Sequence, residues 1–153
     1  MRAALVVTLI AAPALAQDPA LTVDPSVVEA CVAETPAGDL TPDCIGAAAR
    51  QCQQAPGGDT TIGIAQCVMG EHAAWDAALN REYQAARAQY ADDRTAADSL
   101  RDAQRAWIAW RDAECAFQYD RYGGGSMRMI ASANCQMSMT AMRALELRGL
   151  QGW

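Results

Sequence analysis

Six cysteines carry the most reactive chemistry in this 153-residue chain, and their spacing decides what that chemistry is. The nearest two, Cys44 and Cys52, have seven residues between them, whereas zinc sites use close pairs such as C-x2-C. An even, widely spaced set is typical of disulfides in an exported domain, so we expect three bonds. The sequence leaves the pairing open, and closure between neighbours favours Cys31–Cys44, Cys52–Cys67 and Cys115–Cys135.

His72 is the only histidine, and histidine is the side chain best suited to general acid–base chemistry near neutral pH. It lies beside Glu71, off the apolar stripe of its helix, so we expect a solvated surface residue. No serine lies in a G-x-S-x-G setting, and oxidised cysteines offer no thiolate. The sequence therefore predicts no catalytic residue.

Methionines and glycines give the remaining candidate ligand sites. Thioethers in M-x-M pairs bind Cu(I), but residues i and i+2 of a helix point about 200° apart and do not converge. We therefore expect a methionine-filled core or a sticky surface, with no metal and no cofactor; copper is the weaker alternative. The glycine run 123–125 predicts a turn, because a P-loop needs a lysine and this chain has none. Five methionines are close in sequence: Met127, Met129, Met137, Met139 and Met142.

Arg111 is the charged residue most in need of a partner. It shares a helical line with Trp107 and Cys115, which should both point inward. Because an unpaired charge is costly to bury, we expect an interhelical ion pair with Asp76 or Asp112.

The chain begins with features typical of a secretory signal peptide. Residues 1–16 carry Arg2, an apolar run and the small-residue end Ala14-Leu15-Ala16. A membrane span would need about 20 apolar residues, and Pro13 interrupts this run. We expect cleavage near Ala16, a flexible leader over residues 17–25, and a periplasmic or secreted protein.

The whole chain is acidic, with a net charge of −6. Such a surface repels phosphate, so nucleic acid and anionic membranes are poor partners, whereas a basic protein is attracted. Acidity also simply keeps an exported protein soluble. We expect Asp112, Glu114 and Asp120 to form a charged helix face, because glycosidase carboxylates flank a cleft instead.

Three long helices must position these residues. Apolar residues recur at steps of three, four or seven through residues 61–90, which predicts an amphipathic helix. A second helix is expected over 95–120, capped by Asp93 or Thr95, and a third over 127–147 after Ser126 as a cap. Gly149, Gly152 and Trp153 should form a frayed end.

The apolar pattern also predicts which side chains point inward. The expected stripe of the first helix is Ile64, Cys67, Val68, Trp75, Leu79, Tyr83, Ala86 and Tyr90. Its acidic residues, among them Glu71 and Glu82, are expected to face water. In the second helix, Leu100, Ala103, Trp107 and Trp110 are expected to face one way.

Two shorter helices are expected before these, over 26–34 with Ser26 as N-cap and over 41–54. No alternating strand pattern occurs. The predicted fold class is therefore all-α, with a three-helix antiparallel core and a short disulfide-linked helical N-terminal extension. The predicted boundaries are 26–59 for the extension and 60–150 for the helical domain.

Three blocks in this order resemble the LprI-like lysozyme-inhibitor family over residues 52–148. The first block has Cys67, Glu71, Trp75, Asp76, Leu79, Asn80 and Tyr83, the second has Gln104, Trp107, Arg111, Asp112 and Cys115, and the third has Gly124, Gly125, Ser126, Cys135, Thr140, Arg143 and Leu147. The resemblance implies a small exported helical domain that inhibits lysozyme-type glycosidases. Because the residues show no catalytic constellation, we expect no enzymatic activity. An envelope structural or adaptor protein with no enzyme target is the alternative.

If the chain inhibits lysozyme, we expect the loop with Arg121, Tyr122, Ser126 and Arg128 to make the contact. A lysozyme cleft is lined by carboxylates that accept hydrogen bonds from arginine. This loop places two arginines around a flexible tip with an aromatic anchor, and both residue types are common in binding hot spots. A loop that merely joins two disulfide-linked helices is the alternative.

Overall fold

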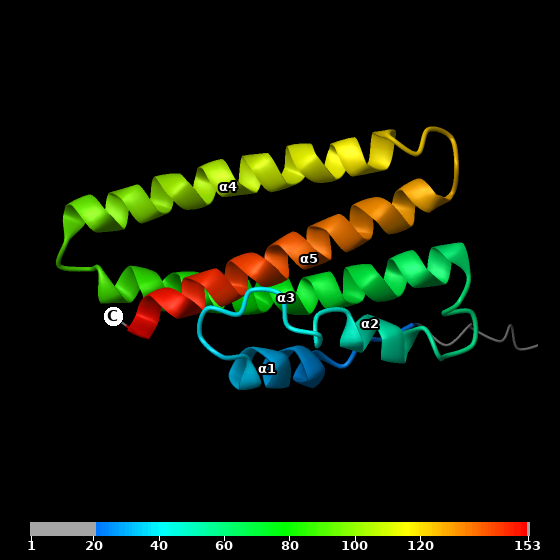
Figure 1. Cartoon of the computed structure of the whole chain (residues 1–153), viewed down its shortest axis with the longest axis horizontal. Helices are drawn as coiled ribbons and strands as arrows, with labels where there is room; N and C mark the ends of the chain where they lie inside the picture. Colours follow the sequence, from blue (N-terminus) through cyan, green and yellow to red (C-terminus); the bar gives the residue numbers. More distant parts are fainter. Residues whose placement is uncertain (1–20, 153) are drawn as a thin grey trace, which may run out of the picture.

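A computed structural model describes residues 21–152 of the chain, and every regular element within them is helical. The expected all-α class is therefore confirmed. The three long helices run in alternating directions along the long axis of the molecule, and α5 lies between α4 and the short helices (Figure 1). The elements are α1 (Pro25–Glu34), α2 (Ala47–Cys52), α3 (Thr61–Gln89), α4 (Arg94–Asp120), α5 (Met127–Gly149) and a short 3-10 helix, η1 (Leu150–Gly152).

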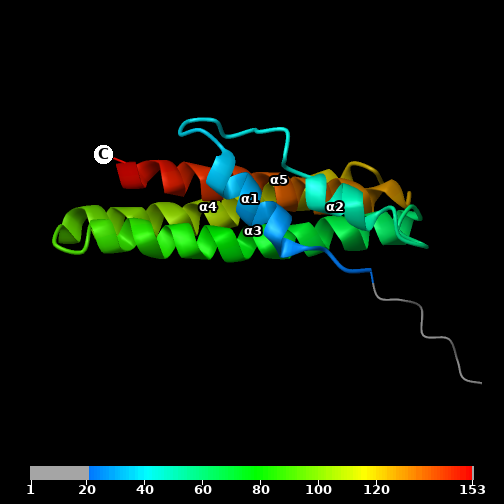
Figure 2. The same ribbon diagram turned by 90° about the horizontal axis from the view of Figure 1, so that it is seen from below.

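The core lies between α3 and α5, and α1 and α2 cover it from one side (Figure 2). Trp75 is fully buried at its centre. The apolar stripe expected for α3 is buried or half-buried, which confirms the period of that helix. Buried residues from several helices close the core, among them Val28, Ala48, Ala78, Leu79, Ala141, Ala144 and Leu147.

Helix α4 packs on α5 along one narrow line, and its buried residues are Gln104 and Cys115. The expectation that Ala103 and Trp110 also face inward is wrong, because both are exposed, Trp110 to 59%. Each directly precedes a residue of the inward line, Gln104 or Arg111, and one residue along a helix turns the side chain by about 100°.

Three disulfides join the elements in the locally closed pattern. Cys31–Cys44 ties α1 to the loop before α2, and Cys52–Cys67 ties the end of α2 to α3. Cys115–Cys135 links α4 to α5.

The start of α1 differs from the expectation. The helix begins at Pro25, and the Asp24 carboxylate, not Ser26, is its cap: Asp24 Oδ1 accepts the Ser26 N–H at 2.9 Å. Proline suits the first helical position because it lacks the N–H that would otherwise stay unpaired there. Of the leader expected over residues 17–25, the described part includes Leu21 and Val23, which pack against the core. The predicted signal peptide lies outside the described residues.

The second short helix is also shorter than expected. Residues 41–46 form turns, and the helix covers only Ala47–Cys52. Gly46 stands at the junction with φ of +86°, a left-handed conformation that glycine adopts at no steric cost.

The ends of the long helices agree with the sequence more closely. Asp93 caps α4, its Oδ1 accepting the Ala96 N–H at 3.0 Å. Ser126 occupies the N-cap position of α5, but its side chain makes no capping hydrogen bond. The expected frayed end is wrong for two residues, since Gly149 belongs to α5 and Gly152 to η1, and Trp153 lies outside the described residues.

Candidate functional site

The tip of the α4–α5 hairpin presents an ordered set of arginine and tyrosine side chains. The Arg121 guanidinium lies 5.3 Å from the centre of the Tyr122 ring and donates to Gln118 Oε1 at 3.0 Å. At the start of α5, on the other side of the loop, the Arg128 guanidinium lies 4.8 Å from the centre of the Tyr119 ring. It donates to the Gly123 carbonyl at 3.3 Å. Both arginines are thus oriented by local contacts.

An apolar hollow of about 330 Å³ adjoins this tip. Tyr119, which carries Arg128 on its ring, is one of the lining residues, so the hollow and the tip form one surface. Ile62 of α3 is 62% exposed in the hollow, and Met69 and Met129 are about 40% exposed. Exposed apolar side chains beside polar groups are a feature that protein-binding surfaces share. We call the tip and the hollow together the tip surface.

A second cluster clamps α4 to α5 and contains residues from two of the family blocks. Two cations contact the Trp107 ring: the Arg111 and Arg143 guanidinium carbons are 5.1 and 5.9 Å from its centre. Arg143 Nε donates to Gln104 Oε1 at 2.9 Å, and Arg111 Nη1 contacts Thr140 Oγ1 at 3.4 Å. These residues hold two helices together, and we call them the α4–α5 clamp.

The carboxylate partner of Arg111 is its neighbour. Arg111 Nη2 pairs with Asp112 Oδ1 at 2.8 Å, within the same helix, so the expected interhelical ion pair does not form. Asp76 instead accepts a hydrogen bond from Asn80 Nδ2 at 3.1 Å on α3. The link from Arg111 across to α5 goes through the Thr140 hydroxyl, while the guanidinium also lies against the Trp107 ring.

The remaining α3 residues of the first family block are structural. Leu79 is buried in the core, and Tyr83 is half-buried with Arg87 over its ring at 6.0 Å.

Glu71 is a buried site that the sequence interpretation placed in water. Its side chain is fully buried and accepts three hydrogen bonds: Oε1 from the Gly46 N–H at 2.7 Å and Trp75 Nε1 at 3.0 Å, and Oε2 from the Ala49 N–H at 2.7 Å. A carboxylate at the start of α2 supplies acceptors for backbone donors that have none within the helix. A signal was present, because Cys67, Glu71 and Trp75 recur every four residues and share one face.

Glu82 was also expected to face water, and it is 8% exposed. Arg81 Nε donates to its Oε1 at 3.1 Å, and Gln151 Nε2 donates to its Oε2 at 2.8 Å. The partner from η1 lies far away in sequence, so the periodicity of α3 alone could not reveal it.

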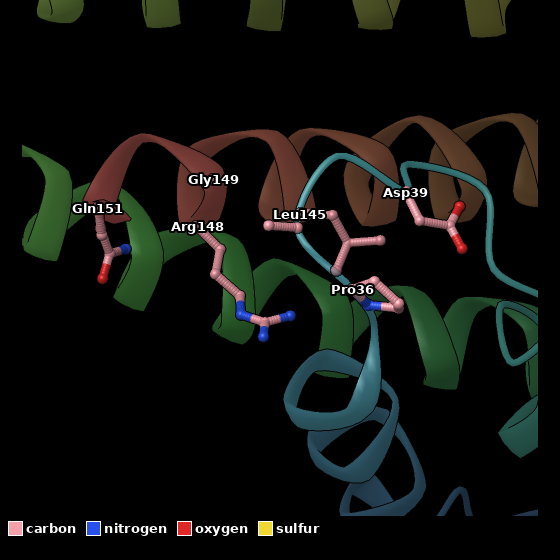
Figure 3. Close-up of a pocket in the computed structure, with 7 residues that line it drawn as sticks. Pro36, Asp39, Leu145, Arg148, Gly149 and Gln151 are labelled. Carbon is pink, nitrogen blue, oxygen red and sulfur yellow. The ribbon is translucent and has the colours of Figure 1, made fainter. Parts of the chain in front are cut away.

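Arg148 supplies hydrogen-bond donors at the C-terminal end of α1. Its guanidinium donates to the carbonyls of Val32, Ala33 and Thr35. Carbonyls at the C-terminal end of a helix have no N–H partner within that helix. Figure 3 shows Arg148 on the wall of a pocket of about 300 Å³ between α5 and the loop at Pro36 and Asp39. Because the Arg148 guanidinium is already hydrogen-bonded to these carbonyls, it is not free to bind a ligand in this pocket.

His72 was predicted to be a solvated surface residue, and this is wrong. Its side chain is half-buried, and its Nε2 is buried without a hydrogen-bond partner among the described residues. Burial lowers its pKa below the ordinary 6.5, and nearby Arg111 lowers it further, against the opposing effect of Asp76 and Asp112. His72 is therefore a neutral, poorly solvated side chain beside the α4–α5 clamp.

No group of three or more histidine, cysteine, aspartate or glutamate side chains is placed to hold a metal ion within residues 21–152. The methionines of α5 divide as the helix period dictates. Met137 is buried in the core, Met139 Sδ lies 3.7 Å from both sulfurs of the Cys115–Cys135 pair, and Met127, Met129 and Met142 are exposed.

Comparison with known proteins connects these features to one family. A family model described as "Lysozyme inhibitor LprI" matches residues 52–147, a range that includes Glu71, the α4–α5 clamp and the whole hairpin tip. An uncharacterized protein of Rhizobium meliloti (strain 1021) is 30% identical over 136 residues, which cover 82% of this chain and 90% of that protein. No solved structure matches the chain.

Proposed function

Because the chain belongs to the family of the lysozyme inhibitor LprI, we propose that it is an exported binding protein that inhibits a lysozyme-type glycosidase and has no catalytic activity of its own. The observation that carries this proposal is the family match, which covers the complete α4–α5 hairpin. Neither the α4–α5 clamp nor the buried Glu71 presents a nucleophile to solvent, which supports a binding role.

Two features support export to the periplasm or beyond. Residues 1–16 have the composition of a signal peptide, with cleavage proposed near Ala16. The three disulfides suit an oxidising compartment. Between residues 21 and 152, no helix has both the length and the apolar character to span a bilayer. We infer an extension over 26–59 and an inhibitor-type helical domain over 60–150.

The tip surface is the proposed contact. Arg121 and Tyr122 are exposed at its end, and the arginine side chains are oriented by the neighbouring rings before any partner arrives. Such preorganisation reduces the entropy lost on binding. The guanidinium groups suit the carboxylates of a glycosidase cleft, while the apolar hollow takes a neighbouring apolar side chain.

Charge supports the same pairing over a longer range. The net charge of −6 attracts a basic enzyme at a distance, and the two tip arginines then meet the acidic cleft at contact. Association should therefore slow as salt concentration rises.

The test is the clearing of a bacterial suspension by lysozyme, with and without the purified protein, over c-type, g-type and phage enzymes. We expect the parent to slow clearing by at least one enzyme. The double variant Arg121→Ala, Arg128→Ala, shown to be folded by circular dichroism, should lose most of this effect. The matched control is Arg94→Ala, Arg105→Ala, which removes the same charge from exposed positions at the start and in the middle of α4, away from the tip.

The outcomes separate the alternatives. Full inhibition by the folded tip variant would remove the tip from the contact, and equal loss in both double variants would assign the effect to net charge. A parent that leaves every enzyme of the panel unaffected would favour an envelope adaptor with no enzyme target.

A further inference from the structure

Helix α4 carries a second apolar face that nothing in the described structure covers. Trp110 and Phe117 are 59% and 58% exposed, more than any other aromatic side chain among the described residues. Both lie on the side of α4 that is turned away from the inward line of Gln104 and Cys115. In Figure 1 this helix forms the outer edge of the molecule, with open solvent beyond it.

The exposed residues on this face follow a coiled-coil spacing. Their steps are three, four, three and four, which place them along one seam of a helix. All of them are exposed. We call this set the outer seam: Ala103, Ala106, Trp110, Ala113 and Phe117.

The outer seam is complementary to itself when two copies meet in antiparallel orientation. A two-fold axis near the middle of the seam places Trp110 of one copy against Ala113 of the second copy, and Phe117 against Ala106. Every central layer then combines one large and one small side chain, as close packing requires. A parallel pair would set Trp110 against Trp110 and leave gaps at the alanine layers, and it would also align the two helix dipoles.

The flank of the seam also suits close approach of a second helix. Ala109 and Ala116 lie beside it and are exposed, so one side of the contact carries no long side chain. No charged residue belongs to the seam between Ala103 and Phe117. We propose that a second copy of this chain occupies the outer seam, forming an antiparallel α4–α4 contact in a two-fold symmetric dimer.

The size of the contact sets the expected strength. Exposed aromatic side chains supply most of the area, and about four helical turns from each copy bury roughly 1,000 Å² in total, near the lower limit for a specific interface. The dimer should therefore form in the micromolar range rather than be permanent. It leaves the apolar hollow on the α3 side of the hairpin uncovered.

The test is sedimentation equilibrium of the full mature protein from low micromolar to millimolar concentration. We expect the parent to change from monomer to dimer over this range. The double variant Ala106→Glu, Ala113→Glu should weaken dimerisation by about a hundredfold or more, because the dimer contact would then bury unpaired carboxylates. The control Ala73→Glu, Ala77→Glu makes the same double exchange at exposed positions of α3 and should leave dimerisation unchanged.

Circular dichroism and thermal unfolding establish that the seam variant and the control variant both still fold. A parent that stays monomeric at millimolar concentration would overturn the proposal, and so would a dimer that the Ala106→Glu, Ala113→Glu variant leaves intact. If the parent is monomeric and this same variant loses lysozyme inhibition, the outer seam belongs to the enzyme and not to a second copy.

Discussion

The two sides of α5 are built on different principles. On one side, α3 packs along most of α5, and α1 and α2 close over the contact with a buried tryptophan and satisfied polar groups at Glu71 and Arg148. On the other side, α4 has two fully buried residues and depends on the clamp around Trp107 and one disulfide. The packed side therefore carries the stability of the domain, and the α4 side is free to present surface to partners.

The largest difference between the two sides should come from Glu71→Ala. The change leaves three buried donors without an acceptor, at about 1–3 kcal/mol each, and we expect a loss of about 3–5 kcal/mol in the free energy of unfolding. The control is Glu114→Ala on α4, whose carboxylate accepts only from Gln118, with an expected loss below about 0.5 kcal/mol. Urea unfolding measures both, and similar losses would contradict the comparison.

Removal of a disulfide should act more locally. Replacing Cys115 and Cys135 by serine should cost about 3 kcal/mol in the chain-entropy model and release α4, so that its amides exchange hydrogen faster while those of α3 stay protected. The matched pair Cys52–Cys67 closes a loop of similar length on the packed side. Its removal should leave exchange in α4 unchanged, and faster exchange in α4 there would show that the two sides are not independent.

Arg148→Ala tests the contact between α5 and the C-terminal end of α1, which belongs to the packed side. The carbonyls at the end of α1 lose a charged donor, and we expect a loss of about 1–2 kcal/mol and a lower Tm. Arg148→Lys should restore part of it, since an ammonium also donates but without the fork of the guanidinium. Arg94→Ala, at a 95% exposed side chain, serves as the control and should not change the Tm.

The smallest expected effect concerns His72, at the boundary between the two sides. Because its pKa lies below 6.5 in the folded protein, the unfolded chain takes up a proton first as the pH falls. The free energy of unfolding should therefore decrease as the pH drops below about 6.5 and level off once the folded protein is also protonated. Urea unfolding over this range should show a flatter profile for His72→Gln. An unchanged profile would assign the pH dependence to carboxylates.

The sequence predicted the long helices and favoured the three local disulfides without fixing the pairing, because both depend on spacing that is visible over short distances. It failed at Glu71 and His72, where residue type suggested solvent. The donors that make Glu71 tolerable in the core belong to Gly46 and Ala49, more than twenty residues earlier, so only the folded extension explains its burial. The residue types of the tip were predictable, but the position of Arg128 over Tyr119 was not.

Trp110 shows the opposite failure. An aromatic residue close to Trp107 was expected to face the core, yet α5 covers only one line of α4, and the neighbouring line stays outside. Sequence periodicity identifies apolar faces, but it does not state how many neighbours a helix has.

The Cys115–Cys135 bond also makes the hairpin tip tolerant of cleavage. It closes a covalent ring through the ends of α4 and α5, and within this ring only Arg121 and Arg128 are sites for a trypsin-like protease. A cut after either arginine opens the backbone of an exposed loop and leaves both pieces joined through sulfur. The nicked protein should migrate as one species on a gel without reductant and as two with it. Its N-terminal piece keeps α1 to α4, while α5 stays tethered beside α3 and able to remain folded on it.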